Sequence, residues 1–209
     1  VFKQALSKKQ MKELVVGRCG DSLLDLSTPL AEGCQTLEPI FADSPEGLDV
    51  IRHSTAHLMA EAVKKLFPAA KVTIGPSVEN GFYYDFEYER PFTPEDLEAI
   101  EAEMVKAVGA DKPFARAEMT SAEARAKFDA EGEKYKVELI DDLGVERVST
   151  YTQGAFTDLC RGPHVPRTGL LKAFKLTSVA GAYWRGDEKN PQLQRIYGTA
   201  WATPKDLEV

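Results

Sequence analysis

The sequence has few of the features that mark several large protein classes. No stretch approaches the roughly 18 consecutive apolar residues that a membrane-spanning helix needs. No charged segment followed by an apolar one opens the chain, so we expect a soluble protein. With 43% hydrophobic and 9% aromatic residues, the composition excludes a disordered or collagen-like chain and predicts a real core.

Cysteine is scarce, with only Cys19, Cys34 and Cys160 among 209 residues. Three thiols cannot all pair within one chain, so free thiols and a reducing compartment, the cytosol, are the simplest interpretation. The length predicts one or two domains. Because the chain opens on Val1 rather than methionine, we expect it to be a piece of a longer protein.

Familiar nucleotide and metal motifs are also missing. The sequence has no phosphate-binding P-loop and no dinucleotide-binding glycine fingerprint. Ser54 directly follows His53, where a zinc peptidase would carry its glutamate base, so that class is disfavoured. A hydrolytic role and a binding role both remain.

Negative charge predominates, with 33 acidic and 26 basic residues. The net charge of −7 argues against capture of nucleic acid by bulk charge. Between Leu159 and Gly198, however, seven basic residues stand against two acidic ones, and they include Arg161, Arg167 and Arg185. Such a segment suits contact with a phosphate backbone, whereas solvated surface side chains are the alternative explanation.

The first part of the chain, residues 1–42, is a small unit with too little apolar surface for an independent core. Its pattern predicts the tail of a helix, a β-hairpin and one further strand, at residues 3–12, 14–26 and 35–41.

A helix start follows, formed by Ser44 as a hydroxyl cap, Pro45 at the first helical position and Glu46 in the first turn. This helix can run to Phe67, where Pro68 stops it, over about 34 Å. It is long enough to form the spine of a domain.

The rest of the chain alternates between short strands and helices. The pattern predicts strands at 71–74 and 81–88, a helix that begins after Thr93 and ends at Gly109, and a short helix after Thr120. Residues 133–143 fit either a helix or a strand, and Gly144 at a C-terminal cap position favours the helix. From Arg147 on, short alternating runs broken by glycine indicate an antiparallel sheet. The predicted fold class is therefore α+β, a long central helix packed on antiparallel β-sheet.

All three histidines of the chain fall in pairs with four-residue spacing. His53 and His57 share one face of the long helix. Cys160 and His164 have the same spacing, but glycine and proline place them on a loop. If that loop covers the helix, three imidazoles and a thiol converge. A zinc site, satisfied buried histidines and a catalytic site are then all open interpretations.

Several segments stand out by their order along the chain. They are Ile51-Arg-His-Ser-Thr-Ala-His-Leu-Met59, Ile74-Gly-Pro76, Asn80-Gly-Phe-Tyr-Tyr-Asp85, Tyr135-Lys136, Asp158-Leu-Cys-Arg-Gly-Pro-His-Val-Pro166, Ala180-Gly-Ala-Tyr-Trp-Arg-Gly186 and Gln194-Arg-Ile-Tyr-Gly-Thr-Ala-Trp201. Together they closely resemble the N-terminal part of bacterial threonyl-tRNA synthetase, over about residues 43–203. The resemblance is specific because several ordered motifs agree.

The resemblance implies two parts. Residues 1–42 resemble a partial TGS module, a small ubiquitin-like β-grasp unit without its opening strands, and residues 43–209 resemble the tRNA editing domain. That domain hydrolyses the ester of threonine tRNA mischarged with serine. A second sieve is needed because one methyl group gives only about 1–3 kcal/mol of discrimination. The parent enzyme attaches threonine with ATP, Mg²⁺ and Zn²⁺ in a catalytic domain of which this chain shows nothing.

The resemblance also implies roles for individual residues. His53 and Lys136 are the catalytic candidates, for activating water and for stabilising developing charge. The residues expected to bind or line the substrate pocket are His57, Gly75, Tyr84, Asp158, Cys160 and His164. The tRNA-contacting candidates are Arg161, Arg167 and Arg185.

The ligand chemistry and the family resemblance give different expectations for a bound metal ion. The related editing region of alanyl-tRNA synthetase holds zinc with the same ligand set, which here would be His53, His57, Cys160 and His164. The threonyl type works without metal, so no cofactor is expected. The expected partner is mischarged tRNA(Thr), with no membrane, and the parent enzyme is expected to be a homodimer through the absent domains. The alternatives are a non-catalytic, metal-stabilised tRNA-binding module and a free-standing aminoacyl-tRNA hydrolase.

Overall fold

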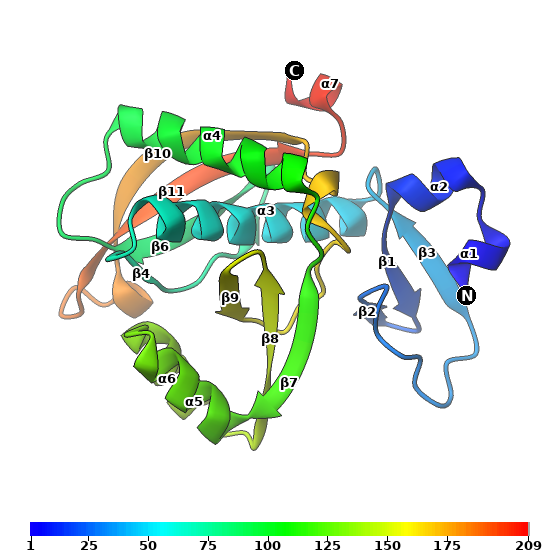
Figure 1. Ribbon diagram of the computed structural model, residues 1–209, viewed down its shortest axis with the longest axis horizontal. Coiled ribbons are helices and arrows are strands. Elements are labelled where there is room, and N and C mark those ends of the chain that lie inside the picture. Colours follow the sequence, from blue (N-terminus) through cyan, green and yellow to red (C-terminus); the bar gives the residue numbers. More distant parts are fainter. Residues whose placement is uncertain (209) are drawn as a thin grey trace.

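A long helix, α3 (Pro45–Leu66), runs through the middle of the computed structural model, which describes residues 1–208 (Figure 1). One antiparallel sheet lies against it, with strand order β10-β11-β6-β4 and with β5 paired to β6. Its strands are β4 (Lys71–Val72), β5 (Ser77–Val78), β6 (Gly81–Glu87), β10 (Ala173–Tyr183) and β11 (Gln192–Trp201). Helix α4 (Pro94–Ala110) packs on α3 and on β10. The α+β fold class is confirmed.

Two smaller sheets flank this central layer (Figure 1). One has the order β7-β8-β9 and packs with two antiparallel helices; its elements are β7 (Ala115–Thr120), α5 (Ser121–Ala130), α6 (Lys134–Leu143), β8 (Arg147–Gln153) and β9 (Phe156–Leu159). The other, the N-terminal sheet, has the order β2-β1-β3; its strands are β1 (Leu14–Cys19), β2 (Ser22–Leu24) and β3 (Leu37–Phe41). Short helical turns complete the chain, namely α1 (Phe2–Ala5), α2 (Lys8–Glu13), Thr168–Leu170, Trp184–Gly186 and α7 (Pro204–Leu207).

The capping signals behave as elementary helix chemistry requires. Ser44 Oγ accepts a hydrogen bond from the Gly47 N–H at 3.0 Å, and the helix ends before Pro68 as expected. Thr93 forms a capping box with Asp96, although α4 runs one residue past Gly109. The helix predicted near Glu133 is confirmed as α6, and Gly144 ends it in the left-handed conformation, with φ of 59°.

The structure differs from these expectations at several points. Residues 3–12 form two short helices rather than one, because Ser7 caps the start of α2. The sheet predicted after Arg147 is divided, since β8 and β9 pair with β7 while β10 and β11 join β6. Strand β7 was not predicted, because its alternating apolar positions are two small alanines and Met119, and most of the strand is exposed, so its hydrophobic signal is weak.

The N-terminal sheet has no core of its own, as its composition predicted. Val15, Val16 and Ile40 are buried in the same apolar cluster as Val50 and Ile51 of α3. This sheet therefore depends on α3 for its apolar contacts.

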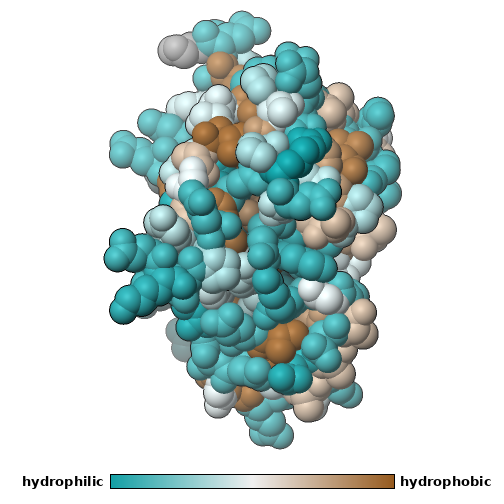
Figure 2. All heavy atoms as spheres, turned by 90° about the vertical axis from the view of Figure 1, so that its left-hand side faces the viewer, coloured by the Kyte–Doolittle hydropathy of each residue, from teal (hydrophilic) through white to brown (hydrophobic). Residues whose placement is uncertain are grey.

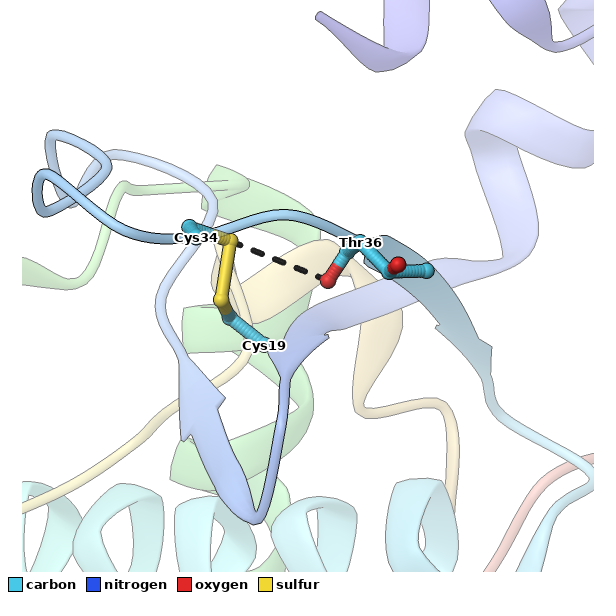
Figure 3. Close-up of a disulfide and its surroundings, with 3 residues drawn as sticks. All are labelled: Cys19, Cys34 and Thr36. Carbon is cyan, nitrogen blue, oxygen red and sulfur yellow. Dashed lines mark hydrogen bonds between the residues drawn. A yellow bond between two sulfur atoms is a disulfide. The ribbon is translucent and has the colours of Figure 1, made fainter.

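A disulfide corrects the prediction of free thiols. Cys19, at the end of β1, bonds to Cys34, in the segment before β3, with the Cα atoms 5.9 Å apart (Figure 3). The two cysteines meet because β1 and β3 pair antiparallel, with Cys19 opposite Leu37. An odd cysteine count requires at least one free thiol, here Cys160, but does not forbid one pair. The pairing removes the argument for a reducing compartment.

The outer surface is polar over the side that lies at the left of Figure 1. Figure 2 shows mostly hydrophilic side chains there, with small separate apolar patches. None of the helices within residues 1–208 is long and apolar enough to cross a membrane.

Thiol titration of the protein purified without reductant tests the disulfide. In denaturant, a thiol reagent is expected to find one thiol, that of Cys160, and three after reduction. The variant Cys34→Ser is the matched control, because it frees Cys19 and should give two thiols before reduction. Three thiols in the untreated wild type would contradict the pairing.

Candidate functional site

The four residues with paired spacing do converge. His53 and His57 project from α3, Cys160 and His164 lie on the segment after β9, and one ligand atom from each lies within 4.8 Å of the others. The loop therefore covers the helix as the sequence predicted. We call these four residues the His/Cys cluster.

His53 is the cluster histidine that keeps partial contact with solvent. Its Nδ1 lies 3.2 Å from the Gly75 carbonyl oxygen, which can only accept, so Nδ1 carries the proton. Nε2 is then an acceptor, and it lies 3.1 Å from Cys160 Sγ. Burial lowers the pKa of His53, and burial raises that of the Cys160 thiol to about 12. At neutral pH the neutral imidazole of His53 therefore lies next to the protonated thiol of Cys160.

Aromatic rings and hydrogen bonds together hold the His164 side chain in place. Its Nδ1 lies 2.9 Å from Ser54 Oγ, which also accepts from the Val165 N–H at 3.1 Å. Its ring stacks on those of His53 and Phe114, at centroid distances of 4.6 and 5.0 Å. Burial lowers the pKa of His164 well below its ordinary value, so this ring is uncharged.

His57 lies one helical turn from His53 and is buried. Its Nδ1 is 3.3 Å from Asp158 Oδ2, and its ring meets that of His164 edge-on at 4.3 Å. Burial lowers its pKa strongly, with a smaller contribution from the neighbouring His53. Gln153 Nε2 donates to the His57 carbonyl at 2.9 Å, which ties α3 to β8.

A buried ion pair lies beside the cluster. Lys136 from α6 and Asp158 from β9 are each 1% exposed and contact one another through Nζ and Oδ1. Lys136 Nζ also donates to the Thr73 carbonyl and to the Tyr84 hydroxyl, so its three protons all have acceptors. The Tyr84 hydroxyl in turn donates to Asp158 Oδ2 at 2.7 Å. Burial, followed by the charge of Asp158, raises the pKa of Tyr84 well above its ordinary value, which keeps it a donor.

Gly75 is required here by close packing. A Cβ atom at this position would lie 2.1 Å from the Tyr84 ring, far inside contact distance. The absence of a side chain lets the segment between β4 and β5 approach Tyr84 and bring the Gly75 carbonyl to His53.

The three arginines are not part of this cluster. Arg167 pairs with Asp111 at 2.7 Å, and Arg185 pairs with Glu138 and Asp142. Arg161 is exposed and forms no ion pair within residues 1–208. Acidic neighbours therefore offset two of the three charges.

Sequence reasoning missed several residues that complete the site. Ser54 orients His164, Thr73 accepts from Lys136, and Gln153 braces His57. Ser54 lies between the two histidines of α3, yet no spacing rule marks a residue whose partner is 110 positions away. Only tertiary contacts reveal these roles.

The His/Cys cluster fits zinc by its donor chemistry. Imidazole nitrogen and cysteine sulfur are the usual ligands of zinc. Within the described residues, His164 Nε2 is buried without a hydrogen-bond partner, so it could face an ion, whereas His57 Nδ1 faces the Asp158 carboxylate at 3.3 Å.

Comparison with known proteins defines the class. Residues 148–197 match the family model described as the threonyl and alanyl tRNA synthetase second additional domain. This stretch includes Asp158, Cys160 and His164, which complete the site opposite α3. The part of the chain that carries these three residues is therefore similar to the second additional domain of threonyl- and alanyl-tRNA synthetases.

Matches to longer, complete proteins identify one family within this class. The chain is 70% identical over 208 residues, all of its length, to the threonine–tRNA ligase of Maridesulfovibrio salexigens. It is 60% identical over 208 residues to that of Oleidesulfovibrio alaskensis and 63% identical over 207 residues to one from Nitratidesulfovibrio vulgaris. The chain belongs to the threonyl-tRNA synthetase family, which confirms the resemblance seen in its motifs. It spans 32% of the length of these curated relatives.

Removal of one partner of the buried ion pair should be costly. Lys136→Met leaves Asp158 buried without its counter-charge, which is expected to lower the free energy of unfolding by about 3–5 kcal/mol. Urea denaturation measures this change.

Two further variants control for this effect. Lys134→Met, on the same helix, removes an exposed pair with Glu87 and a cation–π contact with the Tyr135 ring, and should cost about 1 kcal/mol or less. The double variant Lys136→Met, Asp158→Asn should recover most of the loss. Equal effects of Lys136→Met and Lys134→Met would contradict a structural role for the buried pair.

Proposed function

We propose that this chain is the editing region of a threonyl-tRNA synthetase and hydrolyses the ester of seryl-tRNA(Thr). One observation carries the proposal. A neutral imidazole in partial contact with solvent, that of His53, lies beside a buried and charged network. The family of its relatives supports a tRNA substrate.

In the proposed reaction, His53 acts as general base. A water molecule donates to Nε2, in competition with the Cys160 thiol, and attacks the ester carbonyl of the aminoacyl group. The proton passes to Nε2 while the oxygen–carbon bond forms. His53 then returns the proton to the ribose oxygen as the ester bond breaks, releasing serine and tRNA. Nδ1 stays bonded to the Gly75 carbonyl, which holds the ring in place.

Lys136 supplies positive charge close to the reacting atoms. Negative charge develops on the carbonyl oxygen during attack, and a fixed ammonium in a site of low dielectric stabilises it. Because its protons already have acceptors, Lys136 acts through its charge and by holding Asp158 and Tyr84 in position.

The remaining pocket residues would set specificity. We propose that His57, Tyr84, Asp158 and His164, each at most 2% exposed, form the close-packed layer behind the surface on which the serine side chain rests. A methyl group added to the substrate then meets a close-packed surface that cannot yield without cost. Gly75 and Cys160 would complete the entrance.

We propose the division into a TGS-like part at 1–42 and an editing domain at 43–209, and that the protein acts in the cytosol, where tRNA is charged. Arg161, Arg167 and Arg185 are proposed contacts to tRNA phosphates. Synthesis of threonyl-tRNA with ATP, Mg²⁺ and Zn²⁺, and a homodimer, are proposed for the whole enzyme only.

The first test of this proposal is specificity. Seryl-tRNA(Thr) should be hydrolysed at least about 10-fold faster than threonyl-tRNA(Thr), because the discriminating methyl is worth about 1–3 kcal/mol. Single-turnover deacylation with excess protein measures both rates. Tight binding of seryl-tRNA without hydrolysis would favour the alternative of a tRNA-binding module.

Substitution of His53 separates chemistry from binding. His53→Ala should lower the saturated single-turnover rate by about 10²- to 10⁴-fold, the usual contribution of a positioned base. Arg161→Ala is the contrasting variant, expected to weaken tRNA binding and reduce its salt dependence with little change in that rate. A folded His53→Ala protein with the wild-type rate would refute the assignment.

The pH profile provides a second test of His53. The base works only as neutral imidazole, and its pKa is lowered from 6.5 by burial. The midpoint of the fall in rate with increasing acidity should therefore lie below pH 6.5. A fall that is already half complete at pH 7 would contradict a neutral His53.

The need for metal can be tested directly. A zinc ion held by the His/Cys cluster would polarise a bound water, but neutral His53 provides a base without it. Chelation should therefore leave deacylation largely intact, with elemental analysis of the same sample as control. Stoichiometric zinc, and activity that is lost on chelation and restored by zinc, would overturn the metal-free mechanism.

A further inference from the structure

The N-terminal sheet reaches the site through one side chain. Asp25, just after β2, is half-buried and accepts two hydrogen bonds from the other side of the molecule. Its Oδ1 accepts from the backbone N–H of His164 at 2.8 Å, and its Oδ2 accepts from the hydroxyl of Tyr151 on β8. A carboxylate that accepts two aligned donors is a strong and directional anchor.

This anchor completes the support of His164. The other polar contacts of this part of the loop go to Ser54 on α3, which meets the His164 ring and the Val165 N–H. Asp25 holds the backbone from the opposite direction. The loop that stacks His164 on His53 is thus fixed between α3 and the N-terminal sheet.

Tyr151 connects the anchor to the rest of the loop. Its ring, 1% exposed, meets the His164 ring edge-on at 4.5 Å. Its hydroxyl lies directly under Gly162, where a Cβ atom would come within 1.9 Å. Burial and the Asp25 hydrogen bond raise the pKa of Tyr151, so that it remains a donor. Asp25 and Tyr151 together therefore touch both Gly162 and His164 of the same loop.

We propose that Asp25 is a positioning residue for hydrolysis, supplied by the N-terminal sheet to hold the Cys160–His164 loop against α3. This inference rests on the proposed function. Asp25 touches no reacting atom and acts through the placement of His164 and Cys160. Displacement of such a support by a fraction of an ångström should slow the chemical step and leave tRNA binding unchanged.

The experiment compares three variants of Asp25 and its partners. Asp25→Ala removes both hydrogen bonds and should lower the saturated single-turnover rate about 10- to 100-fold, with the half-saturating protein concentration unchanged. Asp25→Asn keeps an acceptor for the His164 N–H and should retain most of the rate. Tyr151→Phe should give an intermediate loss.

Arg18→Ala is the matched control. Arg18 lies on the same sheet and pairs with Glu46 of α3, yet it touches none of the site residues. It should leave the saturated rate at the wild-type value. If Arg18→Ala slows the reaction as much as Asp25→Ala, the effect is general attachment of the sheet and the inference is overturned.

A second readout does not depend on hydrolysis. Cys160 is the free thiol of the described chain, so its alkylation rate reports the position of the loop. Asp25→Ala should raise this rate several-fold, whereas Asp25→Asn and Arg18→Ala should not. If the wild type fails to deacylate seryl-tRNA, the proposed function falls, whereas unchanged alkylation and deacylation in folded Asp25→Ala overturn the positioning role itself.

Discussion

The ion pair between Lys136 and Asp158 is the interaction on which the site depends. It joins α6 to β9 in surroundings that exclude water, where two charges lose most of their hydration. The Thr73 carbonyl and the Tyr84 hydroxyl offset that loss by satisfying the remaining protons and lone pairs. The ring of Tyr84, held in this way, leaves no space for a side chain at position 75, so glycine fits there. The Gly75 carbonyl oxygen then accepts from His53 Nδ1 and so orients the imidazole. The orientation of the base therefore follows from a charge pair that it does not touch.

The three imidazoles can share so small a volume because they are neutral. Their ring centroids lie 4.3 to 4.8 Å apart, a spacing at which protonated rings would repel one another strongly. Removal from water lowers the pKa of each ring and so maintains the neutral state. Of the three, only His53 is in partial contact with solvent. Burial thus divides chemically identical side chains into two that are closed to solvent and one that can exchange a proton with it.

The features that could be predicted from the sequence are those governed by local rules. Ser44 and Thr93 mark helix starts because capping uses a side chain and an amide only three residues apart. The four-residue spacing of His53 and His57 predicts a shared helical face by the same kind of argument. The prediction that Cys160 and His164 form a site with that face also depended on resemblance to a family. The spacing alone was compatible with a zinc site, with satisfied buried histidines and with a catalytic site.

The missed features depend on partners far away in the chain. Nothing in the sequence around Ser54 or Asp25 marks either residue, because the role of each depends on its hydrogen bond to the distant His164. The disulfide was missed for the same reason, because a count of cysteines does not show that β1 and β3 pair. Strand β7 is mostly exposed and its apolar positions are two alanines and one methionine, so its pairing with β8 rather than its own pattern defines it.

The separation of these partners along the chain has a consequence for synthesis. His53 and Cys160 are 107 positions apart, and Asp25 and His164 are 139 apart. As the chain leaves the ribosome from its N-terminus, α3 emerges with its two histidines long before the loop that will cover them. Closure of such a long loop costs conformational entropy of the chain before the contacts that it forms stabilise the fold. The site can therefore form only after the segment that carries Cys160 and His164 has been synthesised and has reached α3 and Asp25.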